Sequence, residues 1–131
     1  MTDHTETGGT KKYQVGVEAT LEVMGGKWKP LILYHLMTGR KRTSELRRLI
    51  PGITQKVLTA QLRSLETDEI VTRRIYEEIP PRVEYDLTAY GWKLKPALDL
   101  LCYWGEDHLD RIHGDKSKVL EEFREDNGAQ T

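Results

Sequence analysis

Apolar residues recur at helical spacing in the first third of the chain. Val17, Leu21 and Met24 lie at i, i+4 and i+7, which predicts a short amphipathic helix that ends at Gly25. The next segment, residues 28–37, is apolar on nearly every side. A helix of that kind is covered all round, so we expect it at the buried centre of the domain.

Two shorter helices are predicted next, over residues 43–50 and 54–68, because Thr43 and Thr54 are good N-cap residues. A Pro-Gly pair separates them and forces a tight turn. Two short helices joined in this way form a helix-turn-helix pattern.

The period then changes from helical to alternating. Residues 71–76 and 83–87 alternate in character on either side of a proline pair, which predicts a β-hairpin. Thr88 is expected to cap a last helix that runs to His113 and bends at Pro96. The fold class is therefore mainly α with a small β-hairpin: a winged helix-turn-helix with one dimerisation helix added at each end.

Length and composition limit the number of domains and the class of protein. A chain of 131 residues suffices for one domain, here residues 13–113, between a disordered N-terminal tail (1–12) and a polar C-terminal tail (114–131). No apolar stretch reaches the roughly 20 residues that span a bilayer, and the N-terminus lacks the apolar core of a signal peptide. We therefore expect a cytoplasmic protein without a membrane partner.

Charge is unevenly distributed although the net charge is only −1. Residues 27–82 carry twelve basic and six acidic side chains, whereas the rest of the chain carries eight basic and fifteen acidic ones. A basic middle suits a polyanionic partner such as double-stranded DNA, although local fluctuation on a solvated surface would look the same.

The helix after the Pro-Gly turn has two different faces. Leu58, Leu62 and Leu65 fall in one narrow arc, which we expect to pack on the core. The other side and the first turn present small, hydrogen-bonding or basic groups: Thr54, Gln55, Lys56, Thr59, Ala60 and Arg63. Such a face fits the major groove, whereas an ordinary solvent-exposed face is the alternative. The basic hairpin that follows favours DNA recognition.

Further cations flank this helix and are candidates for phosphate contacts or for the wing: Arg40, Lys41, Arg42, Arg73, Arg74 and Arg82. The terminal helices carry apolar residues on more than one side, which a small domain cannot cover alone. We expect the surplus to form a two-fold dimer interface: Val17, Leu21, Met24, Leu100, Tyr103 and Trp104. A thicker monomer core, with the C-terminal tail folded over it, is the alternative.

These segments resemble the HxlR-type family of transcription regulators, which are winged-helix proteins similar in shape to the MarR group. The matching stretches are VEATLEVMGGKWKPLILYHL, ELRRLIPGITQKVLTAQLRSLE, PPRVEYDLTAYG and WGEDHL. The resemblance implies a homodimeric DNA-binding regulator, a repressor or an activator, on an operator with two similar half-sites. It also implies that the helix from Thr54 is the recognition helix and that residues 77–82 form the wing.

One departure from that family concerns thiol chemistry. Many members carry a cysteine just ahead of the "VEAT" stretch, where this chain has Val15 and Gly16. The single cysteine, Cys102, lies on an apolar stripe, which is typical of a core or interface residue. A redox role at the N-terminal position is therefore excluded.

The sequence gives little support for a metal site, an enzyme or a cofactor. His108, His113 and Cys102 share no helix face, so we expect no metal, and no nucleophile motif, P-loop or dinucleotide fingerprint predicts an enzyme or a cofactor. Aromatic residues leave open a pocket for a small-molecule inducer of unknown identity: Trp28, Tyr85, Trp92, Tyr103 and Trp104. A winged helix that binds a protein instead of DNA is the alternative function.

Overall fold

The computed structural model describes residues 10–121, which form two compact units, one up to Lys93 and one from Leu94. The first unit contains α1 (Gly16–Met24), α2 (Trp28–Leu36), α3 (Thr43–Leu49), α4 (Gln55–Thr67), β1 (Val71–Tyr76), β2 (Arg82–Leu87) and α5 (Ala89–Trp92). The second contains α6 (Lys95–His113) and the 3-10 turn η1 (Lys116–Lys118). The predicted class, mainly helical with one antiparallel hairpin, is confirmed.

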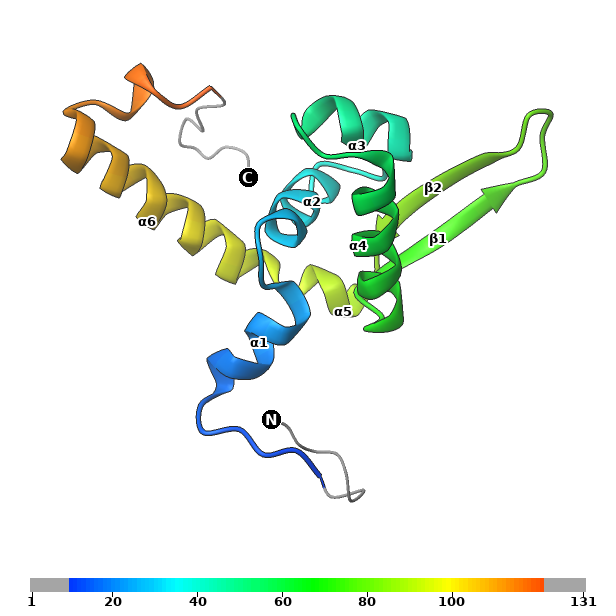
Figure 1. Ribbon diagram of the computed structural model, residues 1–131, viewed down its shortest axis with the longest axis horizontal. Helices are drawn as coiled ribbons and strands as arrows, with labels where there is room; N and C mark the ends of the chain where they lie inside the picture. Colours follow the sequence, from blue (N-terminus) through cyan, green and yellow to red (C-terminus); the bar gives the residue numbers. More distant parts are fainter. Residues whose placement is uncertain (1–9, 122–131) are drawn as a thin grey trace. The chain divides into compact units, whose positions relative to one another are not determined.

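The core of the first unit is built around α2, as predicted. Ile32, Leu33 and Leu36 are fully buried, and α3 and α4 pack beside this helix (Figure 1). The leucine arc of α4, residues 58–65, points into the same core and is also fully buried. Burying each of these side chains contributes roughly 1.5–3 kcal/mol, so the arc fixes which face of α4 remains outside.

Local hydrogen bonds mark the ends of α4. The Thr54 hydroxyl accepts a hydrogen bond from the backbone N–H of Val57 at 3.1 Å, which confirms this residue as the N-cap. At the other end Glu69 adopts a φ of 62°, and the N–H of Ile70 donates to the Leu65 carbonyl. This left-handed step stops the helix and directs the chain into β1.

The N-cap prediction for α3 was wrong by one residue. Thr43 is the first helical residue, and Arg42 occupies the N-cap position. The backbone N–H of Arg42 donates to the Glu45 carboxylate at 2.8 Å. A carboxylate at the third helical position satisfies this orphan donor, so the helix begins earlier than the threonine alone suggested.

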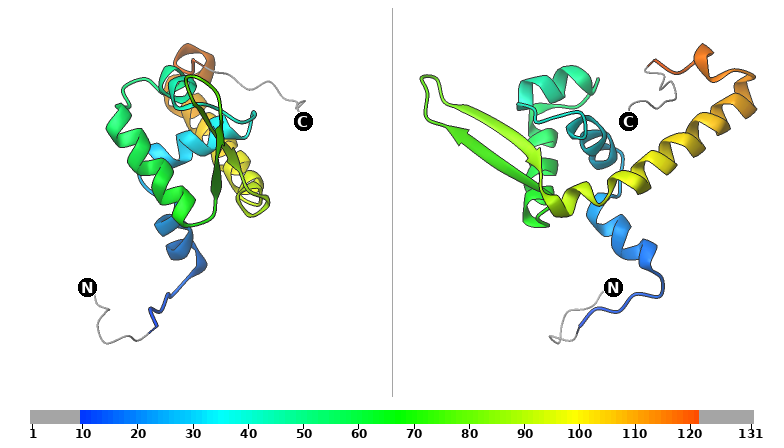
Figure 2. Two further views of the ribbon diagram at one scale, coloured as in Figure 1. Left: turned by 90° about the vertical axis from the view of Figure 1, so that its right-hand side faces the viewer. Right: turned by 180° about the vertical axis from the view of Figure 1, so that it is seen from behind.

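The hairpin pairs Val71 with Leu87 at its root and Tyr76 with Arg82 near its tip. A short bridge between Lys41 and Tyr85 attaches the α2–α3 connection to β2, which the sequence pattern did not predict. The hairpin extends away from α2 and α4 of the first unit as an arm (Figures 1 and 2). Ile75, which pairs with Val83 in this register, is 61% exposed.

The single bent helix predicted from Thr88 to His113 is instead two helices, α5 and α6, separated by Lys93 and Leu94. Pro96 has no N–H to donate to the carbonyl of Trp92, so the helix breaks there rather than bending. Thr88 does cap α5, since its hydroxyl accepts from the Gly91 N–H at 2.9 Å.

The predicted tails lie partly outside the described residues, which exclude 1–9 and 122–131. The first part of the expected C-terminal tail is ordered. Gly114, with a φ of 84°, ends α6, and the backbone N–H of Lys116 then donates to the Asp110 carboxylate. The chain from 114 to 118 thus turns back against α6.

Candidate nucleic-acid interface

The outer face of α4 carries the side chains that the sequence assigned to DNA. Lys56, Ala60 and Arg63 are exposed, and Thr59 is half-buried beside them. The Gln55 amide nitrogen donates a hydrogen bond to the Thr59 hydroxyl at 3.0 Å. This contact leaves the amide oxygen of Gln55 available as an acceptor and the hydroxyl hydrogen of Thr59 available as a donor. A base edge can be read by such a pair.

The inner side of α4 is held firmly, which gives the outer face a defined position. The Lys29 ammonium donates to the Ser64 hydroxyl at 2.7 Å and ties α4 to α2. The turn from α3 is closed by Gly52, whose φ of 89° disfavours residues with a Cβ, and Ile53 is buried behind it. The helix-turn-helix is therefore a rigid support for α4.

The six flanking cations divide into two groups. Arg40, Arg73 and Arg82 each lie beside carboxylates of their own chain: Arg40 with Asp86 (3.8 Å) and Glu84 (4.0 Å), Arg73 with Glu66 (3.8 Å), and Arg82 with Glu78 (3.0 Å) and Glu84 (3.6 Å). Lys41 donates to Thr38 and to the Gly39 carbonyl. Within residues 10–121, Lys41, Arg42 and Arg74 form no ion pair, so these three present uncompensated charge.

The carboxylate partners were missed by sequence reasoning. The hairpin from 71 to 87 contains three arginines and four acidic residues, so it is not basic in sum. Sequence spacing could have indicated the ion pairs of Arg82, because Glu78 precedes it by four residues and Glu84 follows it by two on the same strand face. The positive surface consists of individual guanidinium groups rather than of the wing as a whole.

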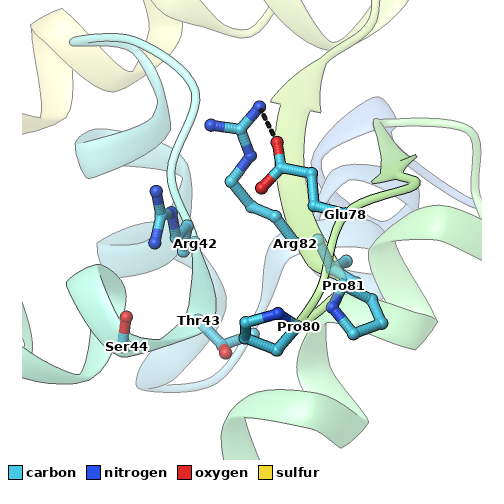
Figure 3. A pocket seen from close by; sticks show the side chains of 8 residues that line it. Arg42, Thr43, Ser44, Glu78, Pro80, Pro81 and Arg82 are labelled. Carbon is cyan, nitrogen blue, oxygen red and sulfur yellow. Dashed lines mark ion pairs between the residues drawn. The ribbon is translucent and has the colours of Figure 1, made fainter.

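A polar hollow of about 430 Å³ lies between the start of α3 and the tip of the hairpin (Figure 3). Its lining residues are Arg42, Thr43, Ser44, Glu78, Pro80, Pro81, Arg82 and Val83. None of the five aromatic residues considered for an inducer pocket lines it. Two arginines and one carboxylate face this space, which suits a negatively charged group.

Apolar side chains are exposed on both terminal helices. In α6, Leu100 is 69% and Trp104 is 68% exposed, and Tyr103 is also exposed. In α1, Val17 and Leu21 are likewise exposed. Met24, also predicted as a dimer-interface residue, differs: it is only 5% exposed and belongs to the core of its own chain, so it offers no exposed apolar surface to a partner.

The comparisons with known proteins identify the family. The HxlR-like helix-turn-helix family matches residues 23–113, the stretch that contains α4 and the hairpin. The chain belongs to this family. HxlR-like proteins are transcription regulators rather than enzymes.

Individual relatives that match this chain are also regulators. The uncharacterised HTH-type transcriptional regulator YtcD of Bacillus subtilis strain 168 is 59% identical over 112 residues, which cover 86% of this chain and 89% of YtcD. A crystal structure of a ytcD regulator is 57% identical, with a TM-score of 0.70 and coverage of 74% of this chain and 99% of that one. The redox regulator HypR in its reduced form is 48% identical, with a TM-score of 0.72 and coverage of 76% and 99%.

In the described part of the chain, no helix combines the length and apolar character needed to cross a membrane. Across residues 10–121, His, Cys, Asp and Glu side chains form no group of three or more that could hold a metal ion.

Proposed function

We propose that this chain acts as a homodimer that recognises an operator with two similar half-sites. As an HxlR-like helix-turn-helix protein it is a DNA-binding transcription regulator. The observation that carries the proposal is the outer face of α4, where Lys56, Thr59 and Arg63 surround the small Ala60 without a bulky apolar side chain. The groups are those that bind base edges and phosphates in the major groove.

Each group has a proposed role. Gln55 and Thr59 act as the hydrogen-bonding pair for a base edge, and Arg63 reads a guanine. The N-terminus of α4, capped by Thr54, directs backbone N–H groups toward a phosphate. Arg42 and Arg74 bind the flanking backbone directly, whereas Arg40, Arg73 and Arg82 must first exchange their carboxylate partners.

The dimer is proposed from the exposed apolar residues of α1 and α6. Val17, Leu21, Leu100, Tyr103 and Trp104 are the expected interface residues. Exposed large apolar side chains gathered on one helix mark interaction sites, and a two-fold pair would place two α4 helices about one DNA turn apart, roughly 34 Å. We also propose that the protein acts in the cytoplasm, where bacterial DNA lies; its relative YtcD comes from Bacillus subtilis.

A salt titration tests DNA binding against the alternative, a winged helix that binds another protein. For six to ten phosphate contacts, affinity for duplex DNA should fall by roughly 10³–10⁵ between about 50 and 200 mM salt. The probe is a duplex enriched by the protein from a random-sequence pool. A flat response, or failure to enrich any duplex, would favour the protein partner.

A further inference from the structure

Arg82, the first residue of β2, is enclosed by groups of its own hairpin. Its Nη2 lies 3.0 Å from a Glu78 carboxylate oxygen, and its Nε lies 3.6 Å from Glu84 (Figure 3 shows the first contact). Its guanidinium carbon also stands 4.1 Å from the centre of the Tyr76 ring. The guanidinium that should approach a phosphate is therefore already bound to anions.

The two carboxylates are not equally held. Glu84 lies within β2, its side chain is only 15% exposed, and it also faces Arg40. Glu78 lies in the loop between the strands, and its side chain is 48% exposed. It lines the hollow beside Arg42, which forms no ion pair among the described residues (Figure 3). Glu78 is thus the partner that can leave Arg82 without disturbing the strand.

A carboxylate and a phosphate offer a guanidinium the same geometry, two oxygens that accept parallel hydrogen bonds. An exposed ion pair is weak enough for a phosphate to replace it. We infer that the Glu78 carboxylate occupies the position on Arg82 that a DNA phosphate would take. It thereby lowers the affinity of the wing for DNA. This inference rests on the proposed function and identifies a residue that sets its strength.

The decisive variant is Glu78→Gln, and the chain offers a matched control in Glu77→Gln. Both remove one negative charge at adjacent positions, but no ion pair of Glu77 occurs in the described residues. Glu78→Gln should tighten binding to the enriched duplex by up to about fivefold per wing, the most that an exposed ion pair contributes. The slope of log affinity against log salt should stay about the same, because in the unaltered protein a phosphate replaces Glu78 on Arg82, and Arg82 neutralises one phosphate in both proteins.

Both variants are then repeated with Arg82→Ala. We expect the advantage of Glu78→Gln over Glu77→Gln to disappear there, since the competing cation is gone. Equal effects of the two glutamate variants, or an advantage that persists without Arg82, would overturn the inference. Weaker binding by Glu78→Gln together with a lower melting temperature would also overturn it, because Glu78 would then support the wing. Failure of the unaltered protein to bind any duplex would instead refute the proposed function itself.

Discussion

Gly91 of α5 packs against the backbone of Ile70, which lies between α4 and β1, and its replacement by alanine should strongly destabilise the protein. A Cβ at this position would stand 2.2 Å from the Ile70 carbonyl oxygen, against about 3.4 Å for ordinary contact. The two atoms would have to separate by about 1.2 Å. Because the obstacle is backbone, no side-chain rotation can relieve it.

The consequence can be estimated from what the displacement breaks. The same Ile70 oxygen accepts from the Thr88 N–H at 3.0 Å and from the Thr88 hydroxyl at 3.2 Å. Overpacking costs about 1–3 kcal/mol and each of the two hydrogen bonds contributes about 1 kcal/mol, so Gly91→Ala should lower the free energy of unfolding by roughly 3–5 kcal/mol. For a domain of this size the melting temperature should fall by roughly 10–30 °C.

Thermal melts followed by far-ultraviolet circular dichroism measure this effect. Gly16→Ala is the control, because a Cβ there meets nothing within 4 Å, and its melting temperature should match or exceed that of the unaltered protein. At a temperature where Gly91→Ala is still folded, DNA affinity should also fall, since Ile70 connects α4 to β1. A melting temperature of Gly91→Ala within two degrees or so of the control would refute the steric argument.

Three further predictions concern the proposed interface. Arg63→Ala should weaken DNA binding by about 1–3 kcal/mol and relax the preference at one base pair, measured by competition with single-base operator variants; uniform weakening would make Arg63 a phosphate contact instead. Thr54→Ala should lower the free energy of unfolding by about 1 kcal/mol in urea melts through loss of its hydrogen bond to Val57, whereas Thr54→Ser should retain the stability. Trp104→Glu should yield monomers in sedimentation velocity, because a charge replaces an exposed apolar side chain, while Arg111→Glu on the same helix should not; a dimeric Trp104→Glu protein would exclude this surface.

Sequence patterns were sufficient for the elements that depend on local chemistry. The leucine arc of α4 identified its buried face, because three residues at helical spacing must share one side. Thr54 and Thr88 marked helix starts, because their hydroxyls accept from backbone N–H groups only three residues away. The outer face of α4 could be predicted as a candidate DNA surface for the same reason, because helical spacing alone decides which side chains share it.

Tertiary structure decided whatever depends on groups that meet in space. Only the hairpin register brings Tyr76 opposite Arg82, and only the bridge from Lys41 to Tyr85 brings Arg40 to the carboxylates of β2. Charge counted along the chain could not distinguish the paired arginines from the exposed Arg42 and Arg74, since an ion pair requires two side chains within 4 Å. Tertiary structure also decided the burial of Met24 and the exposure of Ile75, because both depend on which elements lie nearby rather than on residue spacing along the chain.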